Sequence, residues 1–239
     1  MKKKVLIPLI VVIALVGAGV WYVADYYHSD ESVQTYMQKE GKTEIHEIKE
    51  GIFLDGPGED EAVIFYPGAK VEYTAYIPML YGLAEKGVDC FLVKMPCNLA
   101  VLGQNKADDI LEHYEYAHWY LAGHSLGGAM AASYASNHLD DLDGLILMAA
   151  YPTKSLKSED FSVLSVYGSE DGVLNMAKYE EGLEWMPDNY EELCIEGGCH
   201  AYFGNYGKQK GDGTAGISRE EQQEQTVEAV VRMIEGMRR

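Results

Sequence analysis

From Glu61 to the C-terminus, apolar runs typical of buried strands alternate with segments of helical spacing. The strand-like runs cover residues 62–68, 88–96, 118–125, 143–152, 161–171 and 190–200, and the helix-like segments cover residues 76–87, 106–117, 126–138, 175–186 and about 219–237. Strands that are apolar along their whole length are typical of a sheet covered on both faces. The alternation therefore predicts an α/β fold with a mostly parallel central sheet and helices on both faces.

Residues 1–24 differ from the rest of the chain, because three lysines at positions 2–4 precede an uncharged run over residues 5–24. Twenty helical residues at about 1.5 Å each span about 30 Å, the thickness of the hydrocarbon core of a bilayer. Trp21 and Tyr22 begin an aromatic cluster typical of a membrane interface. We predict one N-terminal transmembrane helix in the cell membrane, with the remaining chain on the extracytoplasmic side.

A cleaved signal peptide is the alternative interpretation of the same segment. Val16-Gly17-Ala18 fits the small-residue pattern of a cleavage site, after a shorter apolar region. The apolar run continues past that point, and no cysteine stands there for lipid attachment. The anchor is therefore the favoured interpretation, and cleavage after residue 18 stays open.

The rest of the chain divides into a spacer and one domain. Residues 25–43 form a predicted juxtamembrane spacer with one short helix, which begins near Ser29 or Asp30 and stops at Gly41. Residues 44–239 form the predicted domain, which opens with two short strands around Glu50-Gly51. A length of 239 residues leaves room for one sizeable core. The formal charge of -19 argues against nucleic acid and anionic lipid headgroups as partners.

Ser125 lies in the pattern Gly-x-Ser-x-Gly, between the strand-like run at 118–125 and the helix-like segment that follows. This context predicts a nucleophile elbow, a sharp turn that exposes the serine hydroxyl. The turn needs small neighbours, which Gly123 and Gly127 supply. It also directs the Leu126 N–H, at the start of a helix, toward the oxygen of a bound carbonyl.

A serine hydroxyl needs a base, and the elbow predicts the chain order serine, acid, histidine. His200 alone among the seven histidines follows the next two strand-like runs, and a flexible Gly197-Gly198 turn precedes it. The acid is expected after the run at 161–168, where Asp171 is favoured by spacing and Glu170 is the alternative. Its role is to hold the imidazole in one tautomer.

The second oxyanion donor and the substrate pocket are expected on loops beside the elbow. The turn Tyr66-Pro67-Gly68 follows the first central strand, and we predict the Ala69 N–H as the donor. We also predict that the aromatic side chains of Tyr66 and Tyr202 bind substrate.

Taken together, the stretches IFYPGAKVEYTAY, VKMPCNLAVLG, AGHSLGGAMAA, YGSEDGV and GGCHAYFGNYGKQKGDG resemble the α/β-hydrolase superfamily. Within it they are similar to bacterial single-domain esterase-like members related to dienelactone hydrolase. The resemblance covers about residues 45–239 and implies a Ser125, Asp171, His200 triad with Ala69 and Leu126 as oxyanion donors. Two residues depart from the pattern: the elbow carries Ser125 where dienelactone hydrolases have cysteine, and Cys199 stands where a polar, asparagine-like residue is expected.

The four cysteines do not show from their spacing whether they form disulfides. An extracytoplasmic domain permits disulfides. Cys90 and Cys194 lie in strand-like runs and are expected to be buried free thiols, whereas a bridge between Cys97 and Cys199 is an alternative. No cysteine or histidine spacing indicates a metal site, and no cofactor is expected.

These features predict a membrane-anchored serine hydrolase that cleaves small carboxylic esters through an acyl-enzyme. A thioesterase or small peptidase uses the same triad and stays an alternative. A catalytically silent, membrane-tethered binding domain is an alternative from another class. The short polar linker at residues 151–160 predicts that no cap or lid covers the site.

Overall fold

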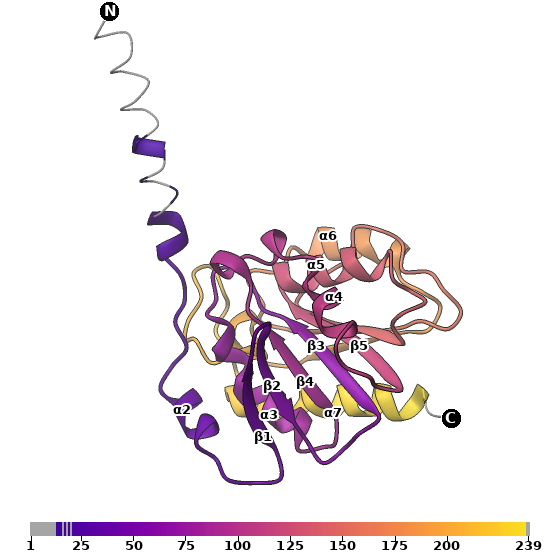
Figure 1. Ribbon diagram of the computed structural model, residues 1–239. Coiled ribbons are helices and arrows are strands. Elements are labelled where there is room, and N and C mark those ends of the chain that lie inside the picture. Colours follow the sequence, from indigo (N-terminus) through magenta and orange to yellow (C-terminus); the bar gives the residue numbers. More distant parts are fainter. Residues whose placement is uncertain (1–12, 16, 18, 20, 238–239) are drawn as a thin grey trace, which may run out of the picture.

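One eight-stranded sheet, in the order β1-β2-β4-β3-β5-β6-β7-β8, organises the chain in this computed structural model, which describes residues 13–15, 17, 19 and 21–237 (Figure 1). The strands are β1 (Glu44–Ile48), β2 (Gly51–Asp55), β3 (Glu61–Tyr66), β4 (Asp89–Val93), β5 (His118–His124), β6 (Gly144–Met148), β7 (Ser162–Gly168) and β8 (Tyr190–Ile195). β1 and β2 are antiparallel to their neighbours, and every pairing from β4 to β8 is parallel. The predicted mostly parallel sheet is confirmed.

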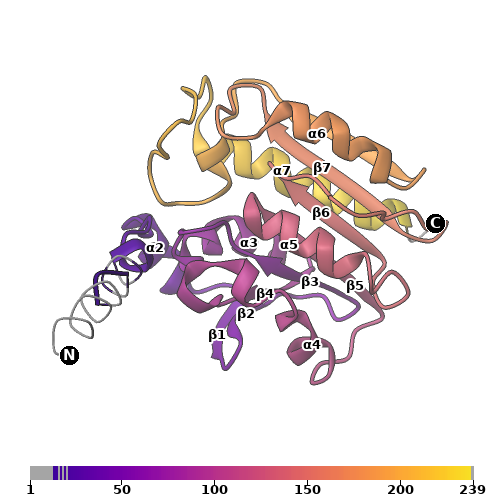
Figure 2. The same cartoon turned by 90° about the horizontal axis from the view of Figure 1, so that it is seen from above.

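Helices cover both faces of this sheet, as the alternation predicts. The α-helices are α2 (Ser32–Met37), α3 (Ile77–Ala84), α4 (Lys106–Leu111), α5 (Leu126–Ala135), α6 (Met176–Gly182) and α7 (Arg219–Met237), and the 3₁₀ turns are η1 (Tyr73–Tyr76), η2 (Pro96–Asn98), η3 (Ala100–Leu102), η4 (Leu183–Trp185) and η5 (His200–Phe203). α3 and α7 lie on one face, while α4, α5 and α6 lie on the other (Figures 1 and 2).

The alternation of side chains along each strand separates two apolar cores. In β3, Val63 and Phe65 join the core under α3 and α7, whereas Ala62, Ile64 and Tyr66 join the core under α4 and α5. All five side chains are buried. The period of two therefore decides, residue by residue, which helices a strand side chain contacts.

The helix predicted over residues 106–117 is shorter than expected, because α4 ends at Leu111. The next residues pack as aromatic side chains against the sheet: the rings of Tyr114 and Phe91 have centroids 4.6 Å apart. Tyr116 also donates a hydrogen bond of 2.5 Å to the Asp89 carboxylate. These tertiary contacts outweigh the helical spacing of the segment.

The carboxyl ends of the parallel strands bring four loops to one edge of the sheet, where ligands of open α/β folds bind. These loops follow β3, β5, β7 and β8. The linker between β6 and β7 contains no helix, which agrees with the prediction that no lid is inserted there. Its Leu156 is fully buried and donates its N–H to the Trp185 carbonyl at 2.8 Å.

Residues 25–31, here called the strap, lie against two of these loops. Tyr27 donates its N–H to the Lys70 carbonyl, at 2.7 Å, on the loop after β3. Asp30 donates its N–H to the Asn205 carbonyl, at 2.8 Å, on the segment after η5. The strap therefore ties the N-terminal segment to the edge of the sheet where the strands end.

The predicted transmembrane helix over residues 5–24 lies mostly outside the described residues and stays a prediction. Among the residues that the structure describes, no helix has the length and apolar character to cross a membrane. The predicted spacer helix is present as α2, and Asp30 accepts a hydrogen bond of 3.0 Å from the Ser32 N–H at its start.

Candidate active site

Ser125 occupies the turn between β5 and α5 in a strained backbone conformation. Its φ and ψ are 54° and -125°, a region that residues with a Cβ rarely adopt. The Ser125 N–H donates to the Met148 carbonyl at 2.9 Å, which fixes the turn against β6. The side chain remains partly exposed at the end of the sheet. This is the geometry that the sequence predicted for a nucleophile elbow.

The glycines around Ser125 are required by close backbone contacts. A Cβ on Gly123 would lie 2.7 Å from the Gly127 carbonyl carbon, and one on Gly127 would lie 2.3 Å from the Pro67 carbonyl oxygen. A Cβ on Gly128 would lie 2.7 Å from the Gly123 carbonyl oxygen. Real Cβ atoms essentially never approach this closely, so the elbow forms only with glycine at these positions.

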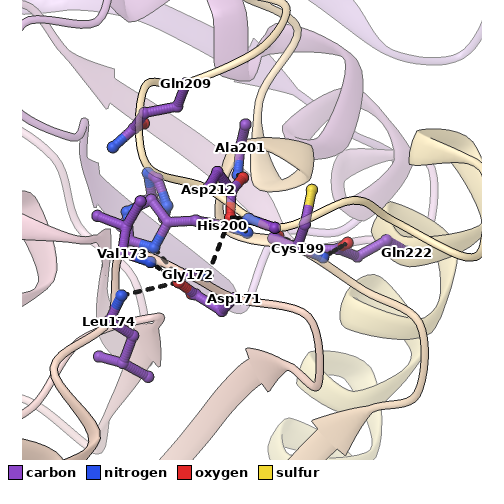
Figure 3. A network of polar contacts seen from close by, with 12 residues as sticks. Asp171, Gly172, Val173, Leu174, Cys199, His200, Ala201, Gln209, Asp212 and Gln222 are labelled. Atoms are coloured by element: carbon purple, nitrogen blue, oxygen red, sulfur yellow. Dashed lines mark hydrogen bonds and ion pairs between the residues drawn. The ribbon is translucent and has the colours of Figure 1, made fainter.

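His200 and Asp171 come together from the loops after β8 and β7 (Figure 3). The His200 Nδ1 and an Asp171 carboxylate oxygen, Oδ2, are 2.8 Å apart, and each side chain is only 1% exposed. The other carboxylate oxygen, Oδ1, accepts the N–H groups of Val173 and Leu174 at 2.8 and 2.7 Å. Gly197, with φ of 73°, makes the turn that leads to His200. Glu170, the alternative acid, is exposed.

The second nitrogen of the His200 ring, Nε2, is buried without a hydrogen bond among the described residues. The ring lies beside the residue that precedes Ser125, with the centroids of the His200 and His124 rings 4.6 Å apart. The structure therefore places the His200–Asp171 pair next to the residue that precedes Ser125, and no hydrogen bond joins His200 Nε2 to the Ser125 hydroxyl among the described residues.

Asp212 is a second carboxylate at this corner, and sequence reasoning assigned it no role. Its oxygens accept backbone N–H groups from His200 at 3.0 Å, Ala201 at 2.8 Å and Gly172 at 3.2 Å (Figure 3). Asp212 thus joins the loop that carries the histidine to the loop that carries Asp171. An aspartate between two glycines was the available signal, since such residues often bond nearby backbone.

Gln222 of α7 holds the other side of the histidine loop. Its side-chain oxygen accepts the Cys199 N–H at 2.9 Å, and its side-chain nitrogen donates to the Cys199 carbonyl at 2.8 Å. Gln222 is fully buried, so this pair of hydrogen bonds is shielded from water.

The two predicted oxyanion donors also lie at this corner. Leu126 is the first residue of α5, so its N–H is at the helix start. Ala69 lies in the turn after β3, which pairs with β5 at Tyr66 and Gly123. The turn after β3 also touches the start of α5, because the Pro67 carbonyl leaves no room for a side chain on Gly127.

The prediction that Tyr66 binds substrate is wrong. Tyr66 is fully buried under α4, where its hydroxyl donates to the Gln104 carbonyl at 2.6 Å and accepts the Ala107 N–H at 3.0 Å. The strand period places Tyr66 on the same face as Ile64, away from the loops. Tyr202 is half-buried beside a pocket of about 330 Å³ on the histidine loop. Its predicted role in binding substrate therefore stays a prediction.

A family model described as the alpha/beta hydrolase family matches residues 62–224, more than half of the chain. The chain belongs to the alpha/beta hydrolase family. The narrower resemblance to dienelactone hydrolase stays a prediction. No curated protein sequence matches the chain.

Several solved structures share the fold of this α/β hydrolase at low identity. A membrane phospholipase A, described as a bacterial virulence factor, is 14% identical with a TM-score of 0.63, and the match covers 99% of both chains. A monoacylglycerol lipase from Paleococcus ferrophilus is 16% identical with a TM-score of 0.58, over 75% of this chain and 97% of that one. A carboxyl esterase from Tuber melanosporum is 11% identical with a TM-score of 0.57, over 86% and 91%.

The cysteines of this α/β hydrolase are all free, so the bridge between Cys97 and Cys199 is wrong. Cys90 is buried as predicted, but Cys194 is exposed. Burial, with the Asp212 carboxylate as a further cause, raises the pKa of the Cys199 thiol to about 12. In the described part of the chain, no cluster of three or more histidine, cysteine or acidic side chains is arranged to hold a metal ion.

Proposed function

We propose that this α/β hydrolase cleaves small carboxylic esters through an acyl-enzyme, with Ser125 as nucleophile. The observation that carries the proposal is the strained Ser125 elbow beside the buried His200–Asp171 pair. The esterase and lipase names of the structural neighbours are consistent with an ester substrate.

In this proposal each group has one step. Asp171 accepts the Nδ1–H of His200, and this leaves Nε2 as the acceptor for the Ser125 proton. The serine oxygen then attacks the ester carbonyl, and the Leu126 and Ala69 N–H groups receive the developing negative charge. The proton passes from Nε2 to the leaving alcohol, and water releases the acid from the serine by the same steps.

Labelling with a fluorophosphonate tests the proposal directly, because this reagent forms a stable bond only with an activated serine. We expect labelling of the intact full-length chain at one site, and peptide mass spectrometry should place the adduct on Ser125. No labelling, or labelling of another serine, would contradict the proposal and favour a silent binding domain. Ester, thioester and peptide substrates assayed in parallel identify the bond that is cleaved.

The short linker between β6 and β7 predicts a preference for short acyl groups. Half-buried Tyr73, Tyr151 and Tyr202 on the surrounding loops suit a small apolar group. A long chain left in water forgoes up to about 0.8 kcal/mol per methylene. We expect kcat/KM for p-nitrophenyl esters to rise no further beyond butyryl and to show no jump when micelles form. A maximum at long chains would indicate an enclosed tunnel.

We propose that residues 1–24 anchor the protein in the cell membrane, with the hydrolase domain on the extracytoplasmic side. The length of the uncharged run and the preceding lysines support this. We expect the full-length protein to sediment with membranes in high salt and to be released by detergent. The double variant Ile13→Arg/Leu15→Arg should lose this retention, because each central arginine costs about 3 kcal/mol of insertion. Recovery of a soluble chain beginning at Gly19 would instead indicate a cleaved signal peptide.

A further inference from the structure

A buried chain of hydrogen bonds lies directly under the turn that carries Ala69, and the triad does not use it. The Gly68 N–H donates to the Tyr76 hydroxyl at 3.0 Å. The Tyr76 hydroxyl is in turn 2.8 Å from Nδ1 of His124, the residue before Ser125. Tyr76 is fully buried and His124 is 1% exposed.

The direction of this chain follows from the charge state of His124. Burial, with the neighbouring His200 as a further cause, lowers the pKa of His124 well below its ordinary value, so the ring is neutral. An amide N–H can only donate, so the Tyr76 oxygen accepts from Gly68 and its own hydrogen is left for His124 Nδ1. In this arrangement the ring hydrogen is on His124 Nε2, which is buried without a hydrogen-bond partner among the described residues. The opposite tautomer would leave both His124 Nε2 and the tyrosine hydrogen unpaired, and each buried unpaired polar group costs about 1 to 3 kcal/mol.

The same contacts determine which amide of the turn is free. The Gly68 N–H is occupied by Tyr76, and the Lys70 N–H donates to the Asn98 carbonyl at 2.8 Å. Between them, the Ala69 N–H has no partner among the described residues. The turn is also sterically fixed, since a Cβ on Gly68 would lie 2.8 Å from both the Tyr76 hydroxyl and His124 Nδ1.

We propose that Tyr76 and His124 are positioning residues for the oxyanion site: they hold the Gly68 amide so that the Ala69 N–H faces the substrate carbonyl opposite Leu126. The inference rests on the proposed function and adds two residues to it. His124 reaches this position because the strand period of β5 turns it to the same face as Ala122, toward the α3 side of the sheet. Removing an oxyanion donor outright costs about 10²–10³-fold in kcat, so a donor that is only released from its position is expected to cost less.

Tyr76→Phe tests the proposal, with Tyr81→Phe as the matched control. Tyr81 is also fully buried, lies five positions along the same helical segment, and its hydroxyl has no hydrogen-bond partner among the described residues. We expect Tyr76→Phe to lower kcat for a p-nitrophenyl butyrate by about 10 to 100-fold, with KM within about twofold. The affinity for a boronic acid, whose tetrahedral adduct resembles the transition state, should fall in the same proportion as kcat/KM. Tyr81→Phe should match the wild type in kcat, in KM and in affinity for the boronic acid.

His124→Leu is the second variant, and it removes the acceptor while keeping the tyrosine. It should reproduce the loss of Tyr76→Phe, and the double variant should be no slower than either single variant, because both break one chain. The proposal is overturned if Tyr76→Phe keeps its kcat, if the loss appears in KM alone, or if Tyr81→Phe loses as much. If Tyr76→Phe does not fold, as judged by circular dichroism, His124→Leu decides by the same criteria. These results are separate from the proposed function, which fails only if the wild type is not labelled at Ser125.

Discussion

Ser125→Ala is expected to lower kcat for a short-chain ester by at least about 10³-fold, with KM and melting temperature close to those of the wild type. In the proposed mechanism the hydroxyl forms the acyl-enzyme, and the oxyanion donors alone would leave little catalysis. Alanine retains the Cβ at the positive φ of the elbow, so the substitution neither adds nor relieves backbone strain. The measurement is a progress curve with p-nitrophenyl butyrate, together with a thermal melt.

Ser133→Ala is the matched control for this variant. Ser133 lies on α5, the helix that follows Ser125, is 9% exposed, and its hydroxyl accepts a hydrogen bond of 3.1 Å from the Gln104 side chain. Its loss removes a structural hydrogen bond but no group near the elbow, so kcat should be unchanged. Continued activity or fluorophosphonate labelling of the Ser125→Ala protein would overturn the assignment of the nucleophile.

Asp171→Asn is expected to lower kcat by about 10³–10⁴-fold without preventing folding. The Val173 and Leu174 N–H groups both point at Oδ1, so the asparagine oxygen is held at that position. The asparagine NH₂ group then faces His200 Nδ1, which becomes an acceptor. The imidazole hydrogen moves to Nε2, and the ring can no longer take the proton of Ser125. The measurement is kcat, with the rate of fluorophosphonate labelling as a second readout that should fall in parallel.

Glu170→Gln is the control for the choice of acid. Glu170 is exposed, and its carboxylate accepts one weak hydrogen bond, from the Ser169 hydroxyl at 3.3 Å. Its substitution should leave kcat within about twofold of wild type, since exposed polar contacts contribute little. If Glu170→Gln lost activity while Asp171→Asn kept it, the acid would have been assigned to the wrong residue.

Much of the fold was predictable because its signals are local. The parallel strands are buried on both faces, so their sequences read as continuous apolar runs, and α7 begins and ends where its amphipathic spacing does. The predicted α4 was too long because its end is set by ring contacts of Tyr114 and Tyr116 with Phe91, and Phe91 is distant in sequence.

The residues of the candidate site also divide into those that a local pattern predicts and those that depend on distant contacts. Ser125 and its glycines form a local motif, chain order selected His200, and chain order together with spacing favoured Asp171 over Glu170. The error at Tyr66 came from reading a strand residue as a loop residue, because the last residue of β3 still follows the strand period. Asp212 bonds backbone groups on other loops, and Tyr76 contacts the Gly68 N–H and the His124 side chain, which are both distant in sequence, so no local pattern predicts these contacts.

The strap determines where a pulling force on the N-terminal end enters the fold. Tyr27 is hydrogen-bonded to the loop that carries Ala69, and Asp30 is hydrogen-bonded to the segment after η5, which carries His200. A pull on the chain ahead of residue 25 is therefore transmitted to these two loops before it reaches the central strands of the sheet. Tension at the N-terminal end and the geometry of the loops that carry Ala69 and His200 are mechanically linked through these two hydrogen bonds.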